Sequence, residues 1–248
     1  MRILLSPAKK MRRDTDSLAV SDLPCFLERT REILQYLRSL TPQELQTLWG
    51  CNDKIAAQNL ERLAEMDLEA GLTPAVLSYD GIAFQHMAPA VFTDSALAYV
   101  QEHLRILSGF YGVLRPMDGV TPYRLEMQAK APVSGFQDLY AFWGSSLHDS
   151  CLDDSGIFLN LASKEYSKAV QPYLEDQEQW IDVTFCEMVK GKLAQKATFA
   201  KMARGEMVRY LAENQIDVPE GMKGFTGLNY HYRQDLSSEN HYVFERTP

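Results

Sequence analysis

Cysteine is scarce in this chain: there are 4 among 248 residues, and they lie far apart. No CxxC pair occurs, and no histidine stands at zinc-ligand spacing from a cysteine. These absences argue against a structural zinc site and against the dense cross-linking of a disulfide scaffold. We therefore expect reduced thiols in a cytoplasmic protein.

Long apolar runs are absent as well. The opening "MRILLSPAKK" has a short apolar run that stops at Ser6 and Pro7, too short for the core of a signal peptide. No segment approaches the roughly 18 apolar residues that a membrane-spanning helix requires. With 46% hydrophobic and 23% charged residues, the composition is that of a globular protein without a membrane partner.

Motifs for catalysis and cofactor binding are missing too. The chain contains no Walker A, GxSxG, HExxH or GxGxxG sequence, and its five histidines stand outside any motif. A glycosylase-type reaction would need a carboxylate in a base-sized pocket, for which Asp80 and Glu126 are candidates. The sequence thus assigns no catalytic residue, metal or cofactor. It favours a binding protein over an enzyme without deciding between them.

What the chain does have is a mixture of helical and strand patterns without regular βαβ alternation. This favours one α+β domain over residues 1–248 rather than a doubly wound sheet. Strands are expected within 2–5, 105–127, 156–163, 180–193 and 224–246, and helices within 22–40 (capped by Ser21 or Asp22), 42–48, 53–64, 94–104, 138–151 and 197–215. Gly205 interrupts the last helix at a cost of about 1 kcal/mol relative to alanine. Close approach of another backbone or of a ligand would explain it.

Net charge is −8 and the pI is about 5.2, which argues against nucleic acid as a partner. Basic residues nevertheless gather locally. The first 20 residues hold five Lys and Arg, including Lys9 and Lys10, against two Asp. A solvated loop would explain them equally well.

A second basic segment lies in the helix expected at 197–215. Lys201 and Arg204 are three residues apart and share a helix face, whereas Arg209 lies roughly 140° round the helix from Arg204. Arg115 and Arg124 flank loops rich in Pro and Gly, and arginine suits bidentate binding of phosphate. The alternatives are a solvated helix and a structural ion pair such as Arg124 with Glu126.

Five motifs together resemble one family. They are "LLSPAKKM", "LSGFYGVLRPMDGVTPYRLEM", "NLASKEYSKAV", "KATFAKMARGEMVRYL" and "GFTGLNYHYRQDLSSENHYVFER", and they span essentially the whole chain. In this order and spacing the chain is similar to the YaaA family of peroxide stress proteins. The resemblance implies an unusual α+β fold, called the cantaloupe fold, with a positively charged cleft and a helix-hairpin-helix that binds DNA. It also implies protection from hydrogen peroxide and limitation of free intracellular iron.

The best candidate for that hairpin lies at residues 42–64. Thr41, Pro42 and Glu44 form a capping-box pattern for a first helix. Gly50 takes the first glycine position of the motif, Asn52 takes the second as a substitute that tolerates left-handed backbone, and Lys54 could reach a phosphate. Asp53 counts against this hypothesis, because it places a carboxylate where the phosphate would lie. The alternative is an ordinary helix corner with Asn52 or Asp53 as the N-cap of the second helix.

A second candidate is "LSGFYGVL" at 107–114, with Gly109 and Gly112, although its β-favouring residues predict a strand. The sequence therefore predicts a protein that binds the DNA backbone without sequence specificity in the response to hydrogen peroxide. Its DNA-binding residues would be Lys9, Lys10, Gly50, Asn52, Lys54, Arg115, Arg124, Lys201, Arg204 and Arg209. The alternative is an enzyme with a nucleic-acid or phosphorylated small-molecule substrate in a basic cleft. The oligomeric state stays open.

Overall fold

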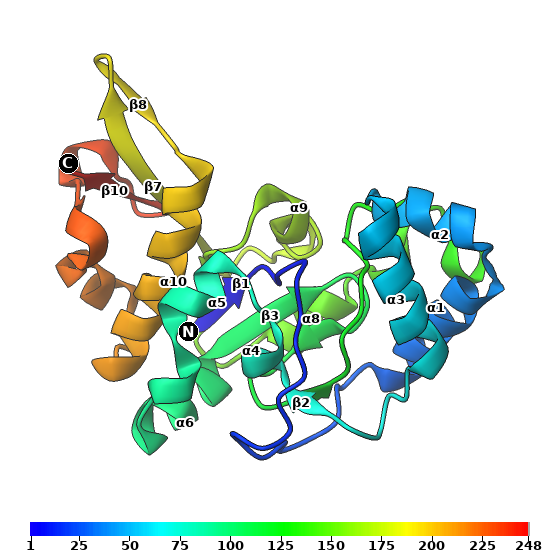
Figure 1. Cartoon of the computed structure of the whole chain (residues 1–248). Helices are drawn as coiled ribbons and strands as arrows, with labels where there is room; N and C mark the ends of the chain where they lie inside the picture. The colour runs from blue at the N-terminus through cyan, green and yellow to red at the C-terminus, as the bar shows by residue number, and fades with distance from the viewer. Residues whose placement is uncertain (248) are drawn as a thin grey trace.

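A mixed sheet of eight strands runs through the computed structural model, which describes residues 1–247 (Figure 1). Its strands are β1 (Arg2–Leu5), β3 (Leu104–Ser108), β4 (Gly112–Leu114), β6 (Ile157–Asn160), β7 (Gln179–Val189), β8 (Lys192–Ala194), β9 (Tyr230–Tyr232) and β10 (His241–Arg246). A separate antiparallel pair joins β2 (Thr73–Pro74) to β5 (Gly119–Val120).

The centre of the sheet is parallel and its edges are antiparallel. Strands follow the order β4-β3-β1-β6-β7-β10-β9, and β8 pairs with β7 off this path. β3, β1, β6, β7 and β10 are mutually parallel neighbours. Ile3 of β1 pairs with Leu104 on one side and Leu159 on the other, and all three are fully buried. Apolar residues fill these strands because both faces of the parallel region are covered.

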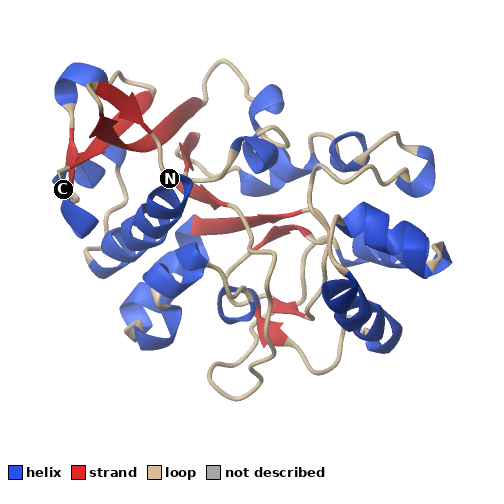
Figure 2. Ribbon diagram, turned by 45° about the horizontal axis from the view of Figure 1, so that its top comes forward, coloured by secondary structure: helices blue, strands red, loops and turns tan. Residues whose placement is uncertain are grey.

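Helices gather on two sides of the sheet. They are α1 (Leu27–Ser39), α2 (Pro42–Trp49), α3 (Asp53–Glu65), α4 (Ala75–Ser78), α5 (Ile82–Met87), α6 (Asp94–His103), α7 (Leu139–Trp143), α8 (Ser146–Cys151), α9 (Lys164–Ser167) and α10 (Ala197–Glu213). α1, α2 and α3 form a group on the right of Figure 1, whereas α5, α6 and α10 lie on the left. Figure 2 shows the middle strands of the sheet between these two groups and further strands at the upper left.

The crossing of α5 and α10 explains the glycine inside α10. A Cβ atom added to Gly205 would lie 2.0 Å from the carbonyl oxygen of Ala83 in α5. This approach confirms the prediction that another backbone passes close to Gly205. Glycine weakens a helix, but here it allows α10 to pack directly on α5.

The prediction of a single mixed fold is confirmed, and most predicted elements lie where expected. The parallel centre of the sheet was not predicted, because the connections between its parallel neighbours are long and broken into short helices. The helix predicted from residue 22 begins only at Leu27, since Asp22 bridges to Asp118 and Pro24 follows in a turn. The helix predicted at 138–151 is two helices, separated at Gly144, whose φ of 54° and ψ of −141° end α7.

Within residues 1–247 no helix is both long and apolar enough to cross a membrane.

Candidate functional site

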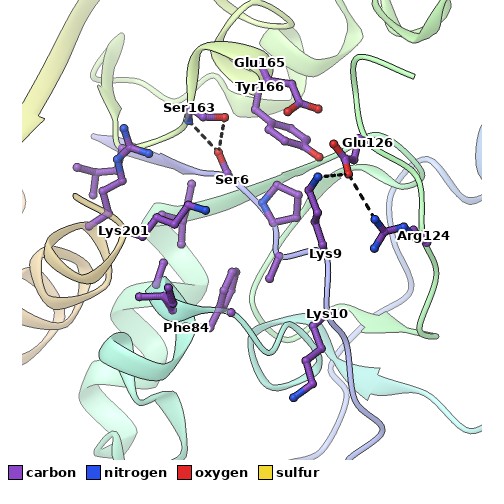
Figure 3. Close-up of a pocket in the computed structure, with 18 of the residues that line it drawn as sticks. Ser6, Lys9, Lys10, Phe84, Arg124, Glu126, Ser163, Glu165, Tyr166 and Lys201 are labelled. Carbon is purple, nitrogen blue, oxygen red and sulfur yellow. Dashed lines mark hydrogen bonds and ion pairs between the residues drawn. The ribbon is translucent and has the colours of Figure 1, made fainter. Parts of the chain in front are cut away.

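A cavity of about 540 Å³ opens where β1 and β6 end (Figure 3). These strands are parallel neighbours, so their carboxyl ends meet at one edge of the sheet, the usual place for ligands in such sheets. Leu5 ends β1 and residues 6–10 follow it, residues 161–166 follow β6, and residues 81–84, residues 123–126 and α10 complete the lining. We call this space the inner cavity.

Two serines join the strand ends at the floor of the inner cavity. The backbone N–H of Ser163 donates to the Ser6 hydroxyl oxygen over 2.8 Å, and the Ser6 hydroxyl lies 3.2 Å from the Ser163 hydroxyl. Ser163 is the N-cap residue of α9, but its side chain makes no capping hydrogen bond. Its hydroxyl is therefore available to the cavity.

One wall of the cavity, which we call the loop wall, holds two basic residues, Lys9 and Arg124, and the acidic residue Glu126 that pairs with them. The amine of Lys9 lies 2.5 Å from the Glu126 carboxylate, and the Arg124 guanidinium lies 3.9 Å from the same oxygen. Arg124 also donates from Nε and Nη2 to the carbonyl oxygen of Trp49, both over 3.3 Å. The ion pair of Arg124 with Glu126, left as an alternative by the sequence, is thus present but long. The stronger attachment of Arg124 is to the end of α2.

Next to the loop wall, Glu165 and Tyr166 face the cavity from α9 (Figure 3). Burial raises the pKa of the Glu165 carboxyl, and the charge of Glu126 adds to this effect. The backbone N–H of Gln128, which donates to Glu165 over 3.3 Å, acts in the opposite direction. Burial also raises the pKa of the Tyr166 hydroxyl. Protonated forms of both groups are favoured here more than in water.

The opposite wall belongs to α10 and carries Lys201 and Arg204, which we call the α10 wall. Figure 3 shows Lys201 across the cavity from Glu126. Within residues 1–247 neither side chain forms a hydrogen bond or ion pair, and the Nε atom of Arg204 is buried without a partner. Burial lowers the pKa of the Arg204 guanidinium. The two walls therefore differ in whether their cations are already neutralised.

A second hollow of about 720 Å³, wider to solvent, adjoins the inner cavity, and we call it the corner groove. Lys9 and Glu126 line both spaces. The corner groove continues along α2 to Gly50 and is bordered on its other side by residues 128–130, including the exposed Lys130. The corner between α2 and α3 therefore lies beside the basic cavity.

The corner between α2 and α3 has the geometry of an ordinary helix corner, the alternative to a DNA-binding hairpin. The predicted capping box at Thr41 and Glu44 is confirmed. Gly50 is left-handed at φ 55°, as the hairpin hypothesis requires. Asn52 is not: it is extended at φ −76° and ψ 168°, and its side-chain oxygen accepts from the N–H of Ile55 as the N-cap of α3. A second left-handed position is unnecessary because the turn is completed by this cap, so the helix-hairpin-helix assignment stays a prediction.

The structure brings six of the ten predicted DNA-binding residues to these two hollows and leaves four outside. Those on the lining are Lys9, Lys10, Gly50, Arg124, Lys201 and Arg204. Those outside are Asn52, Lys54, Arg115 and Arg209. Arg209 turns to the other side of α10, where it binds Glu213 over 2.8 Å, in line with its angular offset. Arg115 is exposed elsewhere and holds Asp118 through its backbone N–H.

The second candidate hairpin, at 107–114, is wrong. This segment is a tight connection between the antiparallel strands β3 and β4, and every residue in it is buried. No helix follows Gly112, because the chain continues directly into β4. The segment lies in the core and does not line either hollow.

Both hollows are also lined by residues that were not predicted from the sequence: Ser6, Lys130, Glu165 and Tyr166. Ser6 follows the predicted strand at 2–5, and Ser163 is the last residue of the one predicted within 156–163. If those strands had been recognised as parallel neighbours, their carboxyl ends would have indicated a shared site. Within residues 1–247 no group of three His, Cys, Asp or Glu side chains is arranged to hold a metal ion.

The whole sequence is similar to those of known proteins. A family model described as "Peroxide stress protein YaaA" matches residues 1–236. A UPF0246 protein of Agathobacter rectalis is 56% identical over 246 residues, covering 99% of each chain. UPF0246 proteins of Limosilactobacillus reuteri and Pediococcus pentosaceus are 51% and 50% identical, over 246 and 244 residues, with at least 97% of each chain covered.

Proposed function

Because this chain belongs to the YaaA family of peroxide stress proteins, we propose that it protects against hydrogen peroxide by binding DNA. It contacts the phosphate backbone in the corner groove and at the mouth of the inner cavity. Such contacts position a protein on DNA but carry no base information, so binding is sequence-nonspecific. Occupied DNA is thereby shielded from damage that free iron causes together with peroxide.

One observation carries this proposal: taken together, the two adjoining hollows are basic on an acidic protein, and the excess positive charge lies in the inner cavity. Their lining holds three carboxylates, Glu44, Glu126 and Glu165, against six basic side chains, Lys9, Lys10, Lys130, Arg124, Lys201 and Arg204. The whole chain has a net charge of −8. A concave surface of one sign concentrates its field toward the opening, so a local positive hollow can attract phosphate despite the total charge.

The paired cations of the hollows remain available to DNA. Lys9 is 65% exposed and Lys10 is 76% exposed, and each contacts a single carboxylate, Glu126 and Asp80 respectively. Their carboxylate partners are only 20% and 19% exposed, but each lysine amine is open to solvent and has three N–H donors. A phosphate can therefore accept from the same amine beside the carboxylate.

Salt dependence of DNA binding tests the proposal. We expect the affinity for a duplex to fall as salt rises. In a plot of log affinity against log salt concentration, each neutralised phosphate should add about 0.9 to the steepness of the slope. The Lys10→Gln/Lys201→Gln protein should lose about two units of that slope, equally for duplexes of different sequence. The matched control is Lys168→Gln/Lys192→Gln, which removes the same charge from exposed positions outside both hollows.

Equal losses in the two double variants would mean that only net charge matters, and would remove the hollows from the site. The peroxide role is tested separately in cells that lack the protein. Survival under hydrogen peroxide should be restored by the wild-type and control proteins and much less by Lys10→Gln/Lys201→Gln.

A second candidate function is an enzyme acting on nucleic acid or on a phosphorylated small molecule. The observation that favours it is Glu165, a carboxyl whose pKa is raised by burial and which faces the inner cavity beside basic residues. Such a group suits general acid–base chemistry. Incubation of oligonucleotides and nucleotides with the wild-type and Glu165→Gln proteins, followed by mass spectrometry, tests it. A product that forms only with the wild type would support it.

A further inference from the structure

We propose that the α10 end of the inner cavity also binds the phosphate group of a nucleotide, through Arg204, Lys201 and Ser163. The proposal goes beyond DNA-backbone binding and does not rest on it. The ligand class is a phosphate monoester with a flat organic body: a free nucleoside monophosphate, or the phosphorylated end of a strand.

Arg204 is the first reason. The other nine arginines that are buried or half-buried within residues 1–247 each have a carbonyl or carboxylate partner for the side chain; they are Arg2, Arg29, Arg31, Arg62, Arg105, Arg124, Arg209, Arg233 and Arg246. Arg204 has none, and its Nε atom is out of contact with water. Arg204 is half-buried, so its guanidinium has lost part of its hydration without gaining a protein partner, which is unfavourable. An anion in the cavity would supply the missing partner.

No acidic side chain is positioned to fill that role. The nearest acid along α10 is Glu206, which is held by His86 over 3.1 Å and does not line the cavity. The two lining carboxylates, Glu126 and Glu165, lie across the cavity from Lys201, as Figure 3 shows. The α10 wall is therefore positively charged and free of competing carboxylates.

The serine pair supplies a hydroxyl donor to the same cavity. Ser6 accepts the backbone N–H of Ser163 and can direct its own proton to the Ser163 hydroxyl oxygen. This arrangement leaves the proton of the Ser163 hydroxyl for another acceptor. Two cations and a hydroxyl donor are a common set of partners for a phosphate group.

The remaining lining explains why the ligand is larger than inorganic phosphate. Between the two walls lie apolar side chains, including Leu5, Pro7, Ile82, Phe84 and Leu161. A volume of about 540 Å³ is in the usual range for sites of organic ligands, whereas a phosphate ion would fill only a small part of it. Apolar surfaces suit the faces of a base, and the polar loop wall can contact its edge.

Calorimetric titration with deoxyadenosine monophosphate, inorganic phosphate and deoxyadenosine tests the site. We expect the monophosphate to bind at least about tenfold more tightly than deoxyadenosine, because hydrogen bonds to a charged group contribute roughly 1.5–3 kcal/mol. Inorganic phosphate should compete with it. Arg204→Gln should weaken both phosphate ligands by about tenfold or more.

The matched control is Arg209→Gln, the same substitution on the same helix, outside the cavity and paired with Glu213. Its affinity for the monophosphate should equal that of the wild type. Thermal unfolding without ligand checks folding. Arg204→Gln should unfold at the wild-type temperature or above, because it removes a half-buried cation that has no protein partner.

A DNA hairpin with and without a 5′-phosphate separates the two sources of ligand. If the 5′-phosphate strengthens binding only when Arg204 is present, the site takes strand ends. If the free monophosphate binds through Arg204 and the 5′-phosphate has no effect, it takes free nucleotides. Deoxyadenosine binding as tightly as its monophosphate, or phosphate ligands that bind Arg204→Gln as well as wild type, would overturn the proposal. Both of these contrary results can be read whether or not an unphosphorylated duplex binds, so they test this site separately from DNA-backbone binding.

Discussion

The two walls of the inner cavity hold similar charges in opposite ways. On the loop wall, Lys9 and Arg124 are bound to Glu126, and Arg124 also holds the carbonyl of Trp49. On the α10 wall, Lys201 and Arg204 have no partner among residues 1–247. Arg124 fastens the loop wall to the end of α2, whereas Arg204 is half-buried without a protein partner and Lys201 is exposed. Similar positive charge is thus neutralised by the protein on one side and not on the other.

The same contrast appears in the two glycines beside these walls. Gly205 in α10 is surrounded, and an added Cβ would lie 2.0 Å from the Ala83 carbonyl oxygen. Gly50 at the corner has nothing within 4 Å of an added Cβ, but its φ of +55° is one that side chains disfavour. Packing therefore fixes the α10 wall, whereas local backbone conformation and the Arg124 attachment fix the corner. The following variants test this difference, beginning with the largest effect.

Gly205→Ala should be the most damaging change. Overpacking of a close crossing costs about 3 kcal/mol, because backbone atoms of α5 cannot move aside as a flexible side chain would. Urea unfolding measures the loss, and nucleotide binding measures any displacement of Arg204. In an open helix the same substitution would stabilise the protein by about 1 kcal/mol. The sign of the change in the free energy of unfolding therefore distinguishes the two cases. A more stable Gly205→Ala protein would contradict the close α5–α10 contact.

Arg124→Met should lower the free energy of unfolding by about 2 kcal/mol, because the buried carbonyl of Trp49 loses its donors. Arg124 is only 11% exposed, and methionine retains much of the apolar stem. The control is Lys9→Met on the same wall: Lys9 is 65% exposed, so its loss should cost less than about 1 kcal/mol. Urea unfolding of both proteins provides the comparison. Equal effects would show that Arg124 does not fasten the corner.

Gly50→Ala should cost about 1 kcal/mol, entirely through the left-handed backbone. Gly71 offers a matched control, since its φ is +62° and an added Cβ would also meet nothing within 4 Å. Gly71→Ala should lose similar stability in thermal unfolding, but only Gly50→Ala changes a residue that lines the corner groove. If DNA binding weakens equally in the two variants, the corner has no specific part in it.

Local features of these walls could be predicted from sequence, and long-range ones could not. The capping box at Thr41, the close approach at Gly205 and the shared face of Lys201 and Arg204 follow from spacing over a few residues. The joining of Ser6 to Ser163 depends on β1 and β6 being parallel neighbours, across more than 150 residues. Charge counts likewise gave no way to tell a paired lysine from an unpaired arginine, because the partners come from distant segments.

The smallest expected effect concerns Glu165, the acid beside the loop wall. Its pKa is raised above the usual 4.5 mainly by burial, because the opposing effects of the Gln128 N–H and of Lys9 are weaker. A carboxyl that binds its proton more tightly when folded contributes stability at low pH, and this contribution is lost as pH rises through the raised pKa. Wild-type stability should therefore include a downward slope above pH 4.5 from this group. Glu165→Gln should remove that slope while its side-chain oxygen still accepts from Gln128.

Urea unfolding at several pH values between 4 and 7 measures the difference between Glu165→Gln and wild type. The variant should gain relative stability as pH rises, by less than about 1 kcal/mol, because Glu165 is only half-buried and water screens its charge. The exposed Glu61→Gln on α3 is the control and should leave the slope unchanged. A gain that instead appears only at low pH would mean that Lys9 and Arg124 stabilise the Glu165 carboxylate. The cations of the loop wall would then not be committed to Glu126, and the contrast between the two walls would fail.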